Sequence, residues 1–204
     1  MSFKVLLVDD DAGVLKALSR VLRAAGYETC AYATAEQFLA DYAPAEPGCL
    51  VLDLNLPQLD GLQLQQALAS TDACQPIIFV SGAGDIPTSV RAMKAGAVDF
   101  LTKPVQRQEL IAAIERARER NAQARQSKLE RDDLERRLAK LTPRERQVLD
   151  YVVAGRLNKQ IAAALGTVEK TIKVHRGRMM AKLGMHNVAE LVRLAERAGL
   201  QPRI

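Results

Sequence analysis

Short apolar runs alternate with longer amphipathic stretches along the first half of this 204-residue chain. The apolar runs predict five strands, at Lys4–Val8, Tyr27–Tyr32, Cys49–Leu54, Pro76–Val80 and Ala97–Leu101. The amphipathic stretches predict helices at Gly13–Ala25, Thr34–Tyr42, Gly61–Ser70, Ile86–Ala95 and from Val105 onward. Such alternation is typical of a parallel sheet with helices on both faces, whose ligands meet the loops at the carboxyl ends of the strands.

From Leu141 onward the pattern is wholly helical. The run Thr142-Pro143-Arg144-Glu145 combines a capping threonine, a proline at the first helical position and a glutamate three residues after the cap, so a helix should begin there. A second helix should begin at Asn158, a third should cover Glu169–Leu183, and Asn187 with Glu190 should cap a fourth that ends near Gly199. Gly166 separates the second helix from the third, as in a helix-turn-helix module.

The stretch between these parts, Arg116 to Lys140, is dense in charge and has neither proline nor glycine. It predicts a helical connector, with Leu134, Leu138 and Leu141 available to pack on a neighbouring helix. The domains expected from these patterns are residues 1–118, a helical linker at 119–140, and residues 141–204.

The overall net charge of +5 hides a strong asymmetry. Up to Pro104 there are 7 Lys and Arg against 12 Asp and Glu, whereas the remainder has 22 against 12. A basic rear half suits a polyanion, most simply nucleic acid, although charge runs also occur as solvated helix faces.

Three cysteines, at positions 30, 49 and 74, lack metal-ligand spacing and lie in or near apolar segments, which indicates reduced and mostly buried thiols. No apolar run approaches the length that spans a bilayer. We therefore expect a cytoplasmic protein with no membrane partner.

Acidic residues follow two of the expected strands. Asp9 and Asp10 come directly after the first strand, and Asp53 lies at the end of the third. If these strands belong to one parallel sheet, the three carboxylates meet in one crevice. Close carboxylates repel one another and favour a cation, and oxygen ligands suit Mg2+. An aspartate beside Mg2+ can act as a nucleophile toward a phosphoryl group.

The front half, Lys4 to about Arg118, resembles the receiver domain of two-component response regulators. The matching pieces are VDDD, VLDLNLP, Gly61, FVSGAGD and FLTKP, in that order. The resemblance implies a flavodoxin-like α/β fold whose five-stranded parallel sheet has the order 2-1-3-4-5. It also implies that Asp53 accepts a phosphoryl group from a cognate histidine kinase.

The same resemblance assigns roles around Asp53. Asp10, Asp53 and the backbone carbonyl of Asn55 would bind Mg2+, and Asp9 would hold a metal-bound water, while Asp11 would be an ordinary acid at a helix start.

Further roles concern the switch. Lys103 would reach a phosphoryl oxygen, and its bond to Pro104 is cis in the family. Ser81 would hydrogen-bond the arriving phosphoryl group, and Phe100 occupies the aromatic switch position.

The rear half, Leu141 to about Ala198, resembles the LuxR-type helix-turn-helix of the NarL/FixJ family through LTPRERQVL, NKQIAAALG and EKTIKVHRGRMMAKLG. The run GDIPTSVRAMKAGAVDF favours FixJ-like members. This implies an all-α four-helix domain that binds a double-stranded DNA operator.

Helical periodicity independently orients the third helix of this half. At about 100° per residue, a buried face centred on Ile172 also contains Met179 and Leu183. The opposite face then carries Lys170, Lys173, Val174, Gly177, Arg178 and Ala181, which suits the major groove.

By resemblance, Lys173 and Val174 would reach base edges, with His175 and Arg176 nearer the phosphates. Gly177 stands where some relatives carry a longer base-reading side chain. Val168 stands where the family often has a capping serine, and Thr167 is an alternative cap one position earlier.

The function that these patterns indicate is a phosphorylation-controlled DNA-binding transcriptional regulator rather than an enzyme. The receiver could block the recognition helix until phosphorylation, or phosphorylation could create a homodimer face near the helices after Ser81 and Leu101. The resemblance places a dimer face of the DNA-binding module at Val188 to Ala195, residues that could instead be core. RNA polymerase is a further candidate partner.

Two other functions stay open. A phosphatase with an Asp nucleophile commonly has a second Asp two residues later, where this chain has Asn55. The output domain could also bind RNA or protein, a possibility that duplex binding dependent on Lys173 and Val174 would exclude.

Overall fold

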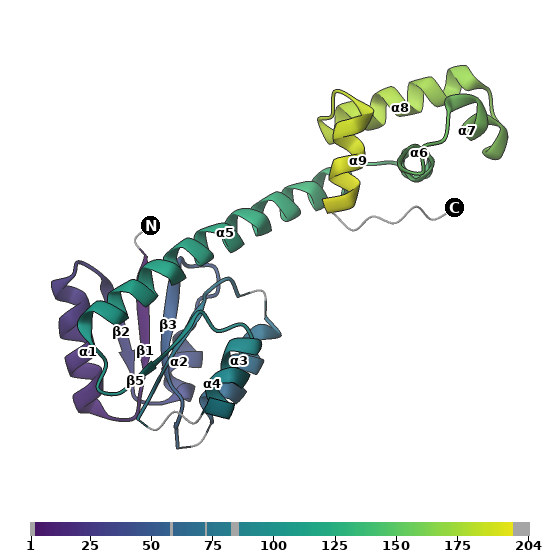
Figure 1. Ribbon diagram of the computed structural model, residues 1–204. Coiled ribbons are helices and arrows are strands. Elements are labelled where there is room, and N and C mark those ends of the chain that lie inside the picture. Colours follow the sequence, from purple (N-terminus) through teal and green to yellow (C-terminus); the bar gives the residue numbers. More distant parts are fainter. Residues whose placement is uncertain (1–2, 58, 72, 83–85, 198–204) are drawn as a thin grey trace. The chain divides into compact units, whose positions relative to one another are not determined.

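The computed structural model describes residues 3–57, 59–71, 73–82 and 86–197. The chain divides into two compact units, residues 1–126 and 127–204, and each is treated by itself below. Figure 1 shows the sheet and its helices in the first unit and short helices in the second.

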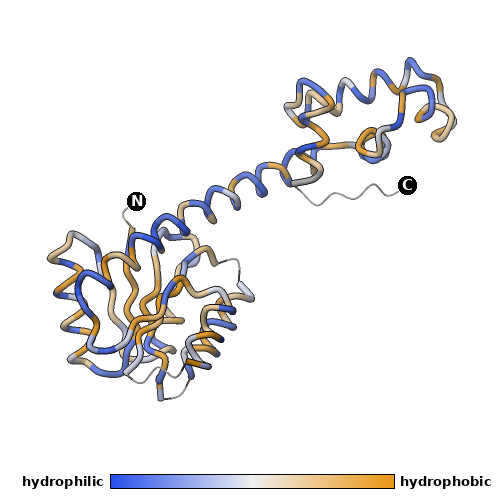
Figure 2. Tube along the Cα trace, viewed as in Figure 1, coloured by the Kyte–Doolittle hydropathy of each residue, from blue (hydrophilic) through white to orange (hydrophobic). Residues whose placement is uncertain are grey.

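The first unit contains a five-stranded parallel sheet in the order β2-β1-β3-β4-β5, as the resemblance implies. Its strands are β1 (Lys4–Val8), β2 (Glu28–Tyr32), β3 (Gly48–Asp53), β4 (Ile77–Ser81) and β5 (Asp99–Thr102). The central strands are buried along nearly their whole length because helices cover both faces, and Figure 2 accordingly shows them as mostly hydrophobic.

Five helices alternate with the strands: α1 (Ala12–Ala24), α2 (Ala35–Asp41), α3 (Gly61–Ala69), α4 (Ile86–Lys94) and α5 (Arg107–Ala139). Side chains of α1 and α5 form one core with one face of the sheet, and side chains of α2, α3 and α4 form a second core with the other face. Asp11, Thr34 and Asp60 cap three of these helices through their side chains. The predicted alternation of strands and helices is therefore confirmed.

The helix α5 is longer than the first unit requires. Its first part is anchored by fully buried Leu110, Ile114 and Ala117, and the buried Asn121 amide donates to the carbonyl of Cys74 at 2.7 Å. Farther along, Leu134 is buried, and Leu138 and Leu141 pack against the core of the second unit, as expected. Because α5 runs through residues 118 and 126 without a break, the domain boundaries expected from sequence stay predictions.

The second unit contains α6 (Pro143–Val153), α7 (Asn158–Ala164), α8 (Glu169–Leu183) and α9 (Val188–Arg197). The starts of all four agree with the sequence patterns, and the Asn187 side chain accepts from the Glu190 amide at 2.9 Å. The expected end of α9 near Gly199 lies outside the described residues. A third core, centred on Val148, Leu149, Ile161, Ile172 and Met179, joins the helices.

None of the helices in the described part of the chain is long and apolar enough to cross a membrane.

Glu145 ties α6 to α8. Its side chain is 3% exposed, and its carboxylate accepts from the Thr142 amide at 2.8 Å within a capping box and contacts Lys182 Nζ at 2.6 Å. The hydrogen bond from Lys182, followed by that from the Thr142 amide, lowers the pKa of Glu145 to about 2. One side chain therefore satisfies the start of α6 and fixes the last turn of α8.

Replacing this carboxylate by Glu145→Gln should lower the free energy of unfolding by about 1–3 kcal/mol, the usual worth of hydrogen bonds to a charged group. Because the folded pKa lies below the unfolded value of about 4.3, the contribution is full above that pH and is lost as pH falls toward 2. Urea unfolding followed by circular dichroism at pH 7, 4 and 3 measures both effects.

The control is Glu169→Gln, because the Glu169 carboxylate makes a surface ion pair with Lys173 at 3.5 Å that should contribute little. An equal loss in the two variants, or a loss for Glu145→Gln that does not shrink at low pH, would contradict the assignment.

Candidate functional site

The register of the sheet places Asp9 and Asp53 side by side. Val8 pairs with Leu52 across β1 and β3, so Asp9 and Asp53, one residue farther along each chain, meet at the carboxyl edge. The two residues are only 3% and 4% exposed. Burial of two carboxylates this close together requires a positive charge nearby.

Lys103, just after β5, supplies that charge. Its backbone amide donates to the carbonyl of Ser81 at 2.8 Å, and its bond to Pro104 is cis, as the resemblance implies. Its Nζ lies 2.6 Å from Asp9 Oδ2 and 2.9 Å from Asp53 Oδ1. Three strand ends therefore bring two carboxylates and one ammonium together.

The charges in this crevice are strongly coupled. Burial raises the pKa of Asp9, and the hydrogen bond from Lys103 offsets part of that rise. Burial also disfavours the Lys103 ammonium, but its hydrogen bonds to Asp9 and Asp53 outweigh this and raise the pKa of Lys103. The lysine is thus held in its charged form between two oxygen ligands.

Two of the three predicted carboxylates, those of Asp9 and Asp53, contact Lys103 in the crevice. Asp10 is exposed, one residue beyond the first acid, and the described part of the chain contains no group of three His, Cys, Asp or Glu side chains arranged for a metal. In this arrangement the Lys103 ammonium lies between Asp9 and Asp53, so the two carboxylates share one positive charge. Two buried carboxylates with free oxygen lone pairs still fit a hard cation such as Mg2+.

Backbone amides fix the orientation of both acids, a role that the sequence interpretation missed. Asp9 Oδ1 accepts from the Asp11 amide at 2.9 Å, and Asp53 Oδ2 accepts from the Asn55 amide at 3.0 Å. Each donor follows its aspartate by two residues, which is the spacing of an Asx-turn and could have been read from the sequence. Asp11 itself caps α1, as expected.

Ser81 ends β4, and Phe100 lies in the neighbouring strand β5, where it pairs with Phe79. Ser81 is completely buried, and its hydroxyl has no hydrogen-bond partner among the described residues. Val80, the residue before it, pairs with Asp53. Phe100 is partly buried, with its ring centroid 6.3 Å from that of Phe79. A buried hydroxyl without a partner is costly, so the position favours an acceptor that arrives from outside the chain.

The periodicity prediction for α8 is confirmed. Ile172, Met179 and Leu183 are fully buried, whereas the whole predicted outer face is exposed: Lys170, Lys173, Val174, Gly177, Arg178 and Ala181. His175 and Arg176 are half-buried, and the Arg176 guanidinium donates to Asn158 Oδ1 at 2.8 Å, which links α8 to α7.

The start of α8 is uncapped. Val168 at the N-cap position makes no side-chain hydrogen bond, and no capping bond from Thr167 replaces it, so that alternative was wrong. In α9, Leu191 and Ala195 are buried in the core of the unit, which favours the core interpretation for these two residues of the expected dimer face.

Comparisons with known proteins agree with both halves. Residues 5–115 match the family described as response regulator receiver domain, and residues 139–195 match bacterial regulatory proteins of the luxR family. The chain belongs to the response regulators that join these two domains.

Individual relatives cover nearly the whole chain. Nodulation protein W of Bradyrhizobium diazoefficiens is 42% identical over 96% of this chain and 86% of its own length. The transcriptional regulatory protein FixJ of the same species is 39% identical over 96% of both chains. The solved structure of the response regulator StyR matches with a TM-score of 0.82 and 44% identity, over 97% of this chain and 100% of that one.

Gly61 packs closely against the backbone of Asp53 at the end of β3. A Cβ built on Gly61 would lie 2.7 Å from the backbone oxygen of Asp53 and 3.1 Å from Phe79 Cε1. Gly61→Ala should therefore displace the end of β3 and lower the free energy of unfolding by about 1–3 kcal/mol. Chemical unfolding measures the loss.

Gly82→Ala is the matched control, because a Cβ at Gly82 meets nothing within 4 Å. A Gly61→Ala variant as stable as the Gly82→Ala variant would show that the chain tolerates a side chain behind Asp53.

Proposed function

We propose that this response regulator accepts a phosphoryl group on Asp53 from a cognate histidine kinase, and that this event controls binding of the C-terminal domain to double-stranded DNA. The observation that carries the proposal is the meeting of Asp9, Asp53 and Lys103 at the carboxyl ends of β1, β3 and β5. The sequence identity of about 40% to a transcriptional regulator over nearly the whole chain supports a role of the C-terminal domain in DNA binding.

Within the crevice, an oxygen of the Asp53 carboxylate would attack the phosphorus atom of the kinase's phosphohistidine, so that a P–O bond forms as the P–N bond breaks and the histidine leaves. Bound Mg2+ would neutralise charge on the transferred group, held by Asp53, Asp10 and the Asn55 carbonyl, with Asp9 binding it through water. Lys103, already 2.9 Å from Asp53 Oδ1, would donate to a phosphoryl oxygen. A cationic donor already positioned beside Asp53 would lower the electrostatic free energy of adding the phosphoryl group's negative charge to this acidic site.

The switch depends on the hydroxyl of Ser81. Once a phosphoryl oxygen is present, the hydroxyl gains an acceptor and moves toward it, which vacates space that Phe100 can fill. The segment after Ser81 and the strand that contains Phe100 then change their packing together. Phosphorylation of Asp53 would in this way alter the surface formed by β5 and the segment after Ser81.

Homodimerisation is the proposed consequence. The helix that follows Ser81 exposes Ile86, Val90 and Met93, which are 78%, 43% and 44% exposed and lie at helical spacing on one side of α4. A second copy of the receiver could cover this apolar stripe. A dimer would present two α8 helices to paired half-sites, with Lys173 and Val174 at base edges and Lys170, His175, Arg176 and Arg178 near phosphates.

We propose a cytoplasmic location, and RNA polymerase stays a candidate partner at target promoters. Asn55 replaces the second aspartate of Asp-dependent phosphatases, which supports stoichiometric transfer rather than turnover.

The central test treats the protein with a small phosphoryl donor and Mg2+. The parent chain should gain the mass of one phosphoryl group, enlarge from monomer toward dimer and bind DNA about tenfold or more tightly, whereas Asp53→Asn should do none of these. Intact-mass spectrometry, light scattering and fluorescence anisotropy provide the measurements. An adduct that persists in Asp53→Asn would assign the acceptor to another residue.

Ser81→Ala separates signalling from folding. Because the hydroxyl is buried without a partner, its removal should leave the unfolding free energy unchanged or raise it by up to about 1–2 kcal/mol. The variant should still be phosphorylated but should lose most of the gain in DNA affinity. Ser81→Thr, which keeps a hydroxyl, should preserve part of that gain. If phosphorylation raised the DNA affinity of Ser81→Ala as much as that of the parent protein, Ser81 would have no part in the switch.

A further inference from the structure

A basic hollow lies between the end of α5 and the end of α8, within the second unit. It encloses about 630 Å3 and is open to solvent. Four cationic side chains line it: Arg136, Arg137, Lys140 and Lys182. Among the described residues of the lining, Asp133 supplies the carboxylate.

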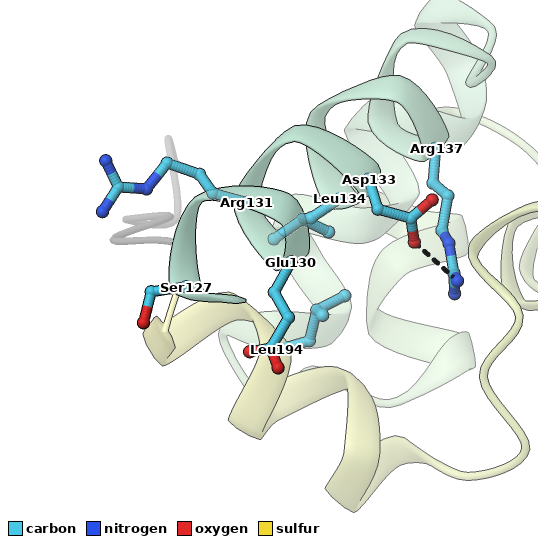
Figure 3. A pocket seen from close by; sticks show the side chains of 7 residues that line it. All are labelled: Ser127, Glu130, Arg131, Asp133, Leu134, Arg137 and Leu194. Atoms are coloured by element: carbon cyan, nitrogen blue, oxygen red, sulfur yellow. Dashed lines mark ion pairs between the residues drawn. The ribbon is translucent and has the colours of Figure 1, made fainter. Parts of the chain in front are cut away.

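The acids nearby do not neutralise this hollow. Asp133 contacts Arg137 at 2.6 Å and Arg136 at 3.3 Å, so one carboxylate serves two guanidinium groups. Figure 3 shows the Asp133–Arg137 ion pair on α5. Lys182 contacts Glu145, and Lys140 has no ion pair with any described residue. Uncompensated like charges repel one another, and an anion between them would relieve that repulsion.

The adjoining helix end would ordinarily disfavour an anion, since the C-terminus of a helix carries partial negative charge. Here the Arg137 guanidinium donates to the carbonyl of Leu183, the last residue of α8, at 2.9 Å. Gly184, with φ of 68°, adds no side chain to the wall of the hollow. The negative end of α8 is therefore covered by a cation.

The position of the hollow points to its occupant. Ala181 belongs both to the hollow and to the exposed face of α8 that carries Val174. Ala181 follows Val174 by seven positions, which at a rise of 1.5 Å per residue is about 10 Å along the helix. The major groove is about 12 Å wide. If Val174 reaches base edges, the Ala181 end lies at the border of the groove, where the phosphates run.

We propose that this hollow binds a phosphate of the DNA backbone, so that the end of the linker helix contributes to DNA binding through Arg136 and Lys140. The proposal rests on DNA binding by α8. The contact is electrostatic and independent of sequence, and it adds to whatever Lys173 and Val174 read. The site therefore combines two segments. Arg136 lies outside residues 139–195, which match the luxR family, whereas Lys140 lies inside them.

The test measures the salt dependence of duplex binding by the full-length, phosphorylated protein. The probes are a duplex selected by the protein from a random-sequence library and a mixed-sequence duplex of equal length. Each lost phosphate contact should reduce the slope of log K against log salt by about 0.9. Lys140→Gln and Arg136→Gln should each show this shift and should weaken binding to both duplexes by the same factor.

Arg131→Gln is the matched control, because Arg131 lies exposed on the same helix and does not line the hollow. It removes the same charge and reports the general field effect. Thermal melting verifies that all three variants are folded. Slopes for Lys140→Gln and Arg136→Gln that equal the slope for Arg131→Gln would overturn the proposal.

The failure of this inference is distinguishable from failure of the proposed function. If Lys173→Ala and Val174→Ala abolish preference for the selected duplex while Lys140→Gln leaves the salt slope unchanged, the protein binds DNA without using the hollow. If the phosphorylated parent protein binds neither duplex, both ideas fail.

Discussion

Two buried carboxylates that share one ammonium are the constraint on which the receiver depends. Asp9 and Asp53 are almost completely buried, and both contact the Lys103 ammonium, without which two buried acids would face each other unpaired. The register of β1 and β3 sets the separation of the acids, and β5 brings the lysine to them. A change of charge on Asp53 therefore alters the electrostatic environment of both Asp9 and Lys103.

Two features outside the crevice would respond to a change of charge on Asp53: a buried hydroxyl without a hydrogen-bond partner and a group of exposed apolar side chains. The Ser81 hydroxyl is buried beside the crevice without a partner, and the Ile86, Val90 and Met93 side chains are exposed on the helix that follows. Each feature costs free energy in the chain as it stands. A phosphoryl oxygen at Ser81 would lower the first cost, and a second molecule over α4 would lower the second. In the proposed switch the two events favour each other because both select the same packing of β4, β5 and α4.

Periodicity and capping chemistry were sufficient to predict most of the fold. Glu145 illustrates why: its spacing from Thr142 defines a capping box, and the same spacing fixes where α6 begins. The buried and exposed faces of α8 followed from helical geometry because that helix has a single core contact surface. Asp53 could be located because strand ends converge in any parallel sheet.

Contacts between distant segments could not be predicted in this way. The position of the Lys103 ammonium between two acids depends on the register of three strands, and nothing in the local sequence shows that Asp10 faces solvent while Asp9 is buried. The bond from Arg137 to Leu183 joins residues 46 positions apart. Side chains whose roles depend on such pairings become visible only when the chain is folded.

The exposed face of α8 explains why affinity and specificity should come from different parts of this protein. Gly177 and Ala181 offer no hydrogen bonds, and Val174 can make only apolar contacts, such as with a thymine methyl group. Of the two residues proposed to reach base edges, Lys173 is the one that can donate a hydrogen bond, so one helix of this kind makes few base-specific contacts. Backbone contacts from basic residues supply affinity without sequence preference, and a dimer that requires two correctly spaced half-sites restores the preference. Because assembly of that dimer is the step proposed to follow phosphorylation, the signal would act on specificity as much as on affinity.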